Sequence, residues 1–222
     1  MKKILMAAAA ALTFCAPAIA NPNVKGWKTM DSMGCMLLRE CTEDVIPIKN
    51  IKDLEDHFPS YDYSYVRDEF NEIVSVMDRI GIGVFLADHK YFPAMHRGVY
   101  HTVGNNFFLN SIYMNDPAVL MSVIRHEGWH AAQDCMAGTI DNSMIAVILD
   151  EDKIPFIWKE MAERTYPPSA VPWEQEAAWA GRTEGMTLKA LQACADGPMW
   201  EAYEPTPLTR QYLVDKGYLR EP

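Results

Sequence analysis

Basic residues are scarce in this 222-residue chain. It has 20 Lys and Arg against 30 Asp and Glu, which gives a net charge of −10 at pH 7. A chain without surplus cations lacks the groups that displace counterions from a nucleic acid or that bind an anionic membrane surface. We therefore expect neither a nucleic acid nor a membrane as partner.

Several motifs that define other chemistries are also missing. The sequence has no P-loop and no nucleophile elbow, and Gly81-Ile82-Gly83 is too short to cradle a phosphate. It has no Cys-x-x-Cys spacing of the kind found in four-cysteine zinc sites. No repeat or linker divides the chain, and 49% of its residues are apolar. We expect one globular domain over residues 21–222.

Long hydrophobic runs are confined to the first twenty residues. Lys2 and Lys3 precede an apolar run over residues 4–15, and Ala18-Ile19-Ala20 follows it. This pattern predicts a secretory signal peptide over residues 1–20, cut after Ala20. A membrane anchor is the alternative, but the run is too short to span a bilayer. The mature protein is expected to be exported, either periplasmic or secreted.

Four cysteines remain after such a cleavage: Cys35, Cys41, Cys135 and Cys194. An even number in an exported protein indicates two disulfides. If residues 31–44 form a helix, Cys35 and Cys41 are about 9 Å apart along its axis, beyond a disulfide's reach of about 7 Å. This favours pairing that segment with Cys135 and Cys194, although a break in the helix would permit a local bridge between Cys35 and Cys41.

The order of elements predicts an α+β fold in which helices predominate. Residues 82–87 are a short apolar run typical of a buried strand, and residues 99–114 indicate two strands around a Gly-Asn-Asn turn. Asp116 and Pro117 are a good N-cap and first helical residue. The expected helices cover residues 64–80, 117–136, 144–164 with a break near Pro155, 173–193 and 208–215.

The most informative segment is His126-Glu127-Gly128-Trp129-His130, inside the helix expected over residues 117–136. Two histidines four apart lie on one face of a helix, about 40° apart around its axis. They can hold a Zn²⁺ while Glu127 lies beside a metal-bound water. The preceding turns are strongly apolar, and burying two imidazoles and a carboxylate together is costly unless a cation joins them.

Zinc normally takes a third protein ligand, and Glu174 is the best candidate. On a regular helix, Ala178, Gly181 and Gly185 share the stripe of Glu174, and such small residues let two helices approach closely. Glu176 would point about 200° away, towards solvent or another partner, and is the alternative ligand. Glu174 could also be an acidic first-turn residue that favours the helix dipole.

Weaker candidates surround these four residues. Gln133 and Asp134 lie three and four residues past His130, where either could hydrogen-bond a metal ligand. Cys135 is expected to face away from the metal. The side chains that could stabilise an oxyanion or line the cleft are His89, His96, His101, Tyr113 and Tyr166.

The segment Val123–Gln133 resembles the active-site helix of the zincin metallopeptidases, and Glu174-Gln175-Glu176-Ala177 is similar to the second helix of the gluzincin group. Ala178 stands where that family usually has Asp, and a glycine is more usual one place after Gly128. The resemblance covers roughly residues 82–190. It implies a small zincin-like sheet, an active-site helix, a second long helix carrying the third ligand, and a substrate-pairing edge strand within residues 107–114.

These observations predict a secreted zinc-dependent metallopeptidase that hydrolyses peptide bonds. His126, His130 and Glu174 would bind Zn²⁺, and Glu127 would act as the general base. The alternative is a non-catalytic secreted module that binds zinc or a protein partner through the same residues. An intact Glu127 favours the enzyme, because a purely structural site has no need of a carboxylate there.

Overall fold

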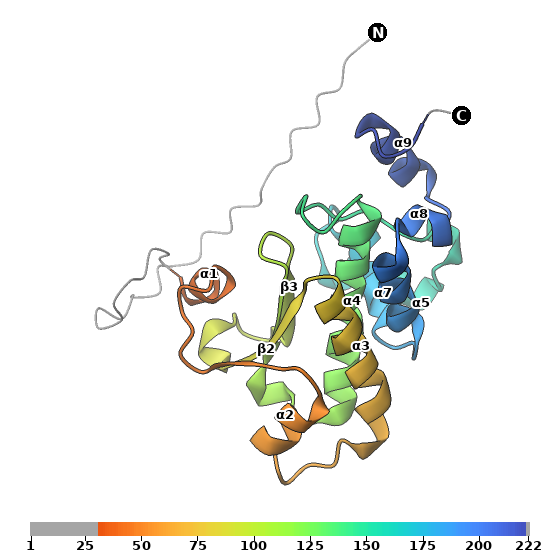
Figure 1. The fold of residues 1–222 in the computed structure, drawn as a ribbon. Helices are drawn as coiled ribbons and strands as arrows, with labels where there is room; N and C mark the ends of the chain where they lie inside the picture. Colours follow the sequence, from red (N-terminus) through yellow and green to blue (C-terminus); the bar gives the residue numbers. More distant parts are fainter. Residues whose placement is uncertain (1–30, 221–222) are drawn as a thin grey trace.

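The computed structural model describes residues 31–220 and shows a mixed four-stranded sheet with most of the helices on one face (Figure 1). The predicted signal peptide, residues 1–20, lies outside the described residues. Among the helices described, none has the length and apolar character needed to cross a membrane. The predicted α+β class, with helices predominating, is confirmed.

The elements follow one another as strands among short helices and then as helices alone. The strands are β1 (Val45–Pro47), β2 (Gly83–Ala87), β3 (Gly98–His101) and β4 (Asn106–Asn110). The α-helices are α1 (Ser32–Leu37), α2 (Ile51–His57), α3 (Arg67–Arg79), α4 (Pro117–Met136), α5 (Phe156–Thr165), α6 (Val171–Ala180), α7 (Met186–Asp196), α8 (Met199–Ala202) and α9 (Pro207–Asp215). Short 3₁₀ helices cover Ser64–Val66, His89–Tyr91, Ser111–Tyr113 and Glu151–Lys153.

The sheet has the strand order β1-β2-β4-β3, with β2 and β4 parallel and the outer pairs antiparallel. All five residues of β4 are buried, as expected of a strand paired on both sides. The expectation of a substrate-pairing edge strand within residues 107–114 is therefore wrong. The edge strand beside the helix that carries the His-Glu-x-x-His motif is β3, which contacts α4 directly.

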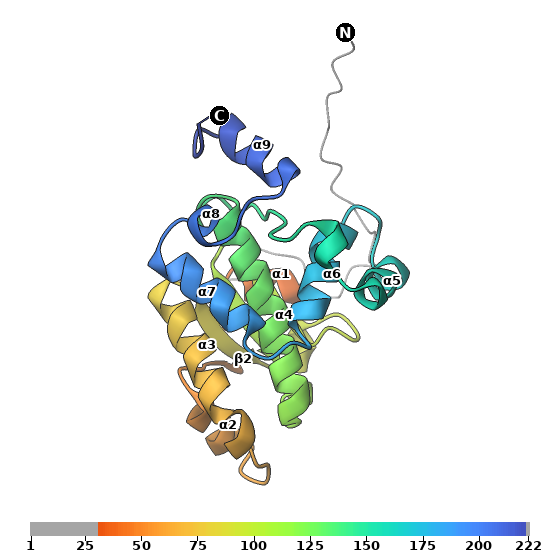
Figure 2. The ribbon, with the colours of Figure 1, turned by 90° about the vertical axis from the view of Figure 1, so that its right-hand side faces the viewer.

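Alternating residues of the sheet supply two separate cores. Val84, Leu86 and Phe107 belong to the main core beneath the helices. Phe108 faces the other way and packs with Cys35 and neighbouring residues of a smaller cluster under α1. On the helical side, α4 runs between the pair α3 and α7 and the pair α5 and α6 (Figure 2). The motif-bearing helix α4 is therefore the central element of the helical layer.

Helix α4 has the predicted boundaries. The Asp116 side chain accepts hydrogen bonds from the backbone N–H groups of Ala118 and Val119, and Pro117 is the first helical residue. Gly138, with φ of +122°, follows the end of the helix. The capping chemistry readable in the sequence thus fixes where the motif-bearing helix begins.

The second long helix is broken into two. Helix α6 ends at Ala180 and α7 begins at Met186, after Gly185, whose φ of +72° interrupts the helix. Gly185 consequently leaves the stripe expected to face α4. Of the helix expected over residues 144–164, the part after Pro155 forms as α5. The part before it begins as extended chain, because the buried Glu176 carboxylate accepts hydrogen bonds from the backbone N–H groups of Ile148 and Leu149.

The disulfide pairing differs from the favoured one. The two bridges are Cys35–Cys41 and Cys135–Cys194. Helix α1 ends at Leu37, and Arg39 then adopts a left-handed conformation with φ of +57°, which turns the chain back on itself. The Cα atoms of Cys35 and Cys41 are thereby 5.2 Å apart, well within bridging distance. The assumption of a continuous helix was the error.

Candidate metal centre

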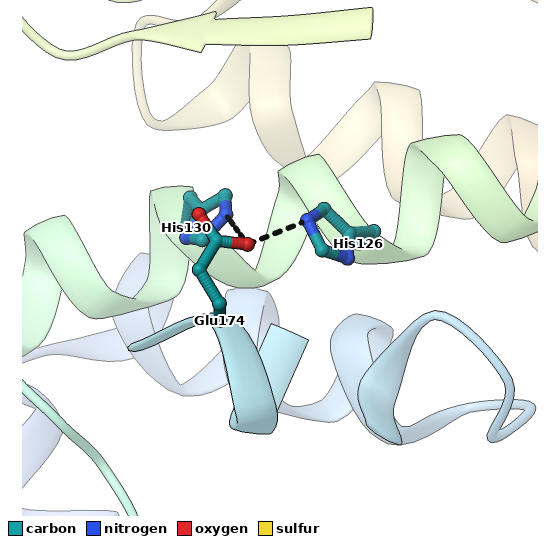
Figure 3. Close-up of side chains that lie close together, drawn as sticks. All are labelled: His126, His130 and Glu174. Atoms are coloured by element: carbon teal, nitrogen blue, oxygen red, sulfur yellow. Dashed lines mark ion pairs between the residues drawn. The ribbon is translucent and has the colours of Figure 1, made fainter. Parts of the chain in front are cut away.

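The three predicted metal ligands converge on one point. His126 and His130 project from successive turns of α4, and Glu174 rises from α6 to meet them (Figure 3). Glu174 Oε2 lies 3.3 Å from His126 Nε2 and 3.7 Å from His130 Nε2. One possible ligand atom from each of the three residues lies within 4.8 Å of the ligand atoms of the other two. The three side chains are close enough to bind a metal ion.

Gly181, which follows the last residue of α6, permits the close approach of α6 to α4. A Cβ placed on Gly181 would lie 3.0 Å from the backbone oxygen of Ser122 and 3.2 Å from His126 Cβ. Gly181 therefore packs against the turn of α4 that carries the first histidine, as the stripe of small residues predicted. The short Glu174 side chain can reach the imidazoles because the two helices nearly touch here.

The charges at the site are coupled. Burial acts to lower the pKa of His130, but Glu174 and the negative charge of Glu127 outweigh it and raise the pKa to about 9. Burial acts to raise the pKa of Glu174, yet the two adjacent imidazoles hold it well below its usual range. Without a metal, the carboxylate is thus ionised beside a protonated imidazole. A metal ion bound through His130 must displace that proton.

The residues fit a metal ion on two further grounds. The contacts from Glu174 Oε2 to both imidazoles are longer than ordinary hydrogen bonds, and this buried atom has no hydrogen-bond partner within residues 31–220. Two imidazole nitrogens and a carboxylate oxygen are also the ligand set of many catalytic zinc sites, which keep a fourth position for water.

Gln133 orients His130, as one of the weaker predictions proposed. The Gln133 Nε2 donates to Glu176 Oε2 at 2.7 Å and to the Trp173 carbonyl at 3.1 Å. Because these acceptors fix the amide, its Oε1 faces His130 Nδ1 at 2.8 Å. His130 Nδ1 therefore donates to Gln133, which leaves Nε2, facing Glu174, as the atom that a metal would bind once its proton is displaced.

Glu176 points away from the metal ligands towards another partner, the second of the two expectations, and it neither reaches solvent nor joins the ligand cluster. Its side chain is fully buried, and its oxygens accept hydrogen bonds from Trp129 Nε1 at 3.0 Å and Leu149 N at 2.7 Å, besides those described above. Glu176 thus joins α4, α6 and the extended segment over residues 144–149.

Glu127 is held by the edge strand. Its Oε2 accepts a hydrogen bond from the backbone N–H of Tyr100 at 3.0 Å. The Tyr100 hydroxyl in turn donates to Asp134 Oδ2 at 2.9 Å. Asp134 therefore supports β3. The suggestion that it hydrogen-bonds a metal ligand is wrong. Sequence reasoning missed Tyr100, because a backbone N–H leaves no trace in residue type.

A cleft of about 770 Å³ opens over the site and is lined by His126, Glu127, His130 and Glu174. Of the five candidates for cleft-lining or oxyanion roles, His96 and Tyr166 line this cleft. The other three do not line it: His89, His101 and Tyr113. Burial, followed by the neighbouring Glu174, raises the pKa of Tyr166, so its hydroxyl stays protonated at neutral pH.

Comparisons with protein-family models, with curated proteins and with solved structures find no match for this chain.

Proposed function

We propose that this protein is a zinc-dependent metallopeptidase of the zincin type that acts outside the cytoplasm on peptide or protein substrates. The observation that carries the proposal is the convergence of His126, His130 and Glu174 at the base of a cleft that also contains Glu127. Zinc is the metal favoured by two imidazoles and one carboxylate. When bound, it would polarise the scissile carbonyl and acidify a water.

In this proposal, Glu127 is the residue that transfers the proton. It lies between the two histidines in sequence, and its Oε2 accepts the Tyr100 N–H at 3.0 Å. That bond holds the carboxylate in place in the wall of the cleft. Glu127 takes a proton from the attacking water and passes it to the departing amine. Tyr166 lines the same cleft, where its protonated hydroxyl can donate a hydrogen bond to the developing oxyanion.

Export is supported by two features of the chain. Both disulfides are typical of proteins that mature in an oxidising compartment. The basic and apolar pattern of residues 1–20 is that of a secretory signal. A periplasmic or secreted location follows from both together.

Replacing Glu127 by Gln tests the assigned mechanism. The amide keeps the size of the side chain but cannot accept a proton, so hydrolysis of denatured casein should fall by about 10²–10⁴-fold. Zinc content, measured by elemental analysis, should stay at one ion per chain, because Glu127 is not a ligand. Glu72→Gln, at an exposed position of α3, is the matched control.

The same measurements separate the enzyme from the non-catalytic module. Zinc binding without chelator-sensitive hydrolysis in the wild type would support the module. Hydrolysis that survives in Glu127→Gln would refute the role given to Glu127. A mature, zinc-exposed protein without zinc would contradict both readings.

A further inference from the structure

Two arginines lie beside the cleft that opens over the metal centre. Arg97 lines the cleft itself, and Arg182 lines a smaller hollow of about 190 Å³. The cleft and this hollow share Ser122 and His126 as lining residues, so they adjoin along α4. Both arginines are exposed, in a protein whose net charge is −10. Cations at this position are therefore a local exception to the charge of the molecule.

Two glycines place these arginines at the same turn of α4. Gly98, directly after the first arginine, packs so closely that a Cβ there would lie 2.6 Å from Val123 Cγ1. Gly181, directly before the second arginine, packs on the carbonyl oxygen of Ser122. Ser122 and Val123 belong to the turn that precedes His126 in the helix. The arginines thus lie at the end of the cleft nearer the start of α4, one on the β3 side and one on the α6 side.

The backbone that carries Arg97 is fixed from below. The Arg97 carbonyl accepts a hydrogen bond from the Asn110 backbone N–H at 2.9 Å, and Asn110 Nδ2 donates to the His96 carbonyl at 2.7 Å. Asn110 is itself buried. Arg97 Cζ lies 5.5 Å from the centre of the Tyr113 ring, a cation–π contact. The contact holds the guanidinium group in place and leaves its N–H groups free to bind a ligand.

Neither guanidinium is neutralised by an acid of the described chain. Arg97 and Arg182 form no ion pair within residues 31–220, whereas five other arginines do: Arg67, Arg79, Arg125, Arg164 and Arg210. Among the described residues, the acids that line the cleft and the hollow are Glu127 and Glu174. A divalent metal ion would offset these two charges, and the arginines would then give this end of the cleft a positive potential.

A carboxylate is the ligand that these arginines fit best. A guanidinium group is planar and always charged, and it binds a carboxylate through two parallel hydrogen bonds. Peptides carry carboxylates on Asp and Glu side chains and at a free C-terminus. We propose that Arg97 and Arg182 determine substrate specificity by binding a carboxylate of the peptide, on the side of the scissile bond that lies over Ser122. The identity of the ligand rests on the proposed peptidase function.

Mapping of cleavage sites tests the proposal. The wild-type protein digests denatured, dephosphorylated casein, and mass spectrometry identifies the bonds that are cut. Enrichment of Asp and Glu on one side of these bonds would identify a side-chain carboxylate, whereas cuts confined to chain ends would identify a free C-terminus. Arg97→Gln and Arg182→Gln should each weaken the pattern, and the double variant should abolish it. Both positions are exposed, so the substitutions carry little risk to folding.

Synthetic peptides give the magnitude of the effect. A peptide that covers the most frequently cut bond is compared with the same peptide in which an amide replaces the carboxylate. The wild type should lose about 10–100-fold in kcat/KM, the effect of losing a hydrogen bond to a charged group, and the double variant should lose nothing. For a side-chain carboxylate, Arg97→Glu should instead favour Lys at that position.

Arg39→Gln is the matched control. Arg39 is also exposed and also lies over an aromatic ring, 5.1 Å from the centre of Phe85, but it lines neither the cleft nor the hollow. The control should leave the preference unchanged. A preference lowered equally in Arg39→Gln would reduce the effect to the net charge of the protein and would overturn the proposed site.

The remaining outcomes separate this proposal from the peptidase function. Cleavage of casein with neither pattern, or an unchanged preference in the double variant, overturns the proposal and leaves the peptidase function standing. A protein that hydrolyses nothing refutes the peptidase function, and the site is then tested by calorimetric titration of the zinc-loaded protein with acetyl-Ala-Glu-Ala-amide and its Gln counterpart. Tighter binding of the Glu peptide that is lost in the double variant retains the carboxylate site, and equal binding of the two peptides overturns it.

Discussion

Gln133→Leu should weaken zinc binding without removing any metal ligand. The Gln133 side chain is fully buried and makes three hydrogen bonds, to His130 Nδ1, the Trp173 carbonyl and Glu176. Leucine keeps the approximate volume and makes none of them. His130 then loses the partner that fixes its ring and tautomer, and losses of this kind typically lower metal affinity about 10–100-fold.

The same change should lower the free energy of unfolding of the zinc-free protein. The Trp173 carbonyl and His130 Nδ1 lose buried partners, each at about 1–3 kcal/mol. Zinc affinity is measured by competition with a chromogenic chelator, and stability by urea unfolding followed by circular dichroism. Gln211→Leu, on the exposed face of α9, controls for the substitution itself. A zinc affinity within twofold of the wild type would refute the orienting role of Gln133.

Two further perturbations test other parts of the site. Gly181→Ala should force α6 away from α4, because the new Cβ would lie 3.0 Å from the Ser122 carbonyl oxygen and 3.2 Å from His126 Cβ. We expect the free energy of unfolding to fall by about 1–3 kcal/mol and zinc to bind more weakly. An unchanged zinc affinity would contradict the close packing of the two helices as a requirement for the site. Asp134→Asn concerns pH: burial raises the pKa of Asp134 from 3.8 to about 7, although the Tyr100 hydrogen bond opposes the rise. Between those values the folded state holds a proton that the unfolded state has lost, so this group's contribution to stability falls as pH rises from about 4 to 7. In Asp134→Asn, stability should no longer fall with pH in this way, and the variant should be more stable than the wild type at pH 8 by up to about 4 kcal/mol. Identical stability–pH profiles for the two proteins in urea unfolding would refute the raised pKa of Asp134.

The parts of the site that could be predicted from sequence depend on short-range geometry. The cap at Asp116 sets the start of α4, and helical spacing then places His126 and His130 on one face. Glu174 was found for a related reason, since Gly181 marks the side of α6 that packs closely on α4. Rules of this kind hold because they involve residues within one or two helical turns of each other.

Other features have the opposite character, because tertiary contacts decide them. The first part of the helix expected over residues 144–164 is absent, because Glu176, distant in sequence, binds the backbone N–H groups of Ile148 and Leu149. The unusual Gly128 likewise has a packing reason: a Cβ there would lie 2.9 Å from Met77 Cε and from Thr187 Cγ2, on α3 and α7. Neither partner can be identified from the local sequence.

The Cys135–Cys194 bond has a consequence for how the metal centre assembles. It spans 59 residues and encloses Glu174 in the resulting loop, with its first cysteine little more than one turn beyond His130. In the denatured, oxidised chain this tether shortens the covalent path between the histidines and the acid, which reduces the entropy lost when they meet. Oxidised protein diluted from denaturant should therefore recapture zinc sooner than reduced protein, as stopped-flow measurement with a zinc-sensitive dye would show; equal rates would mean that the tether plays no part in assembly.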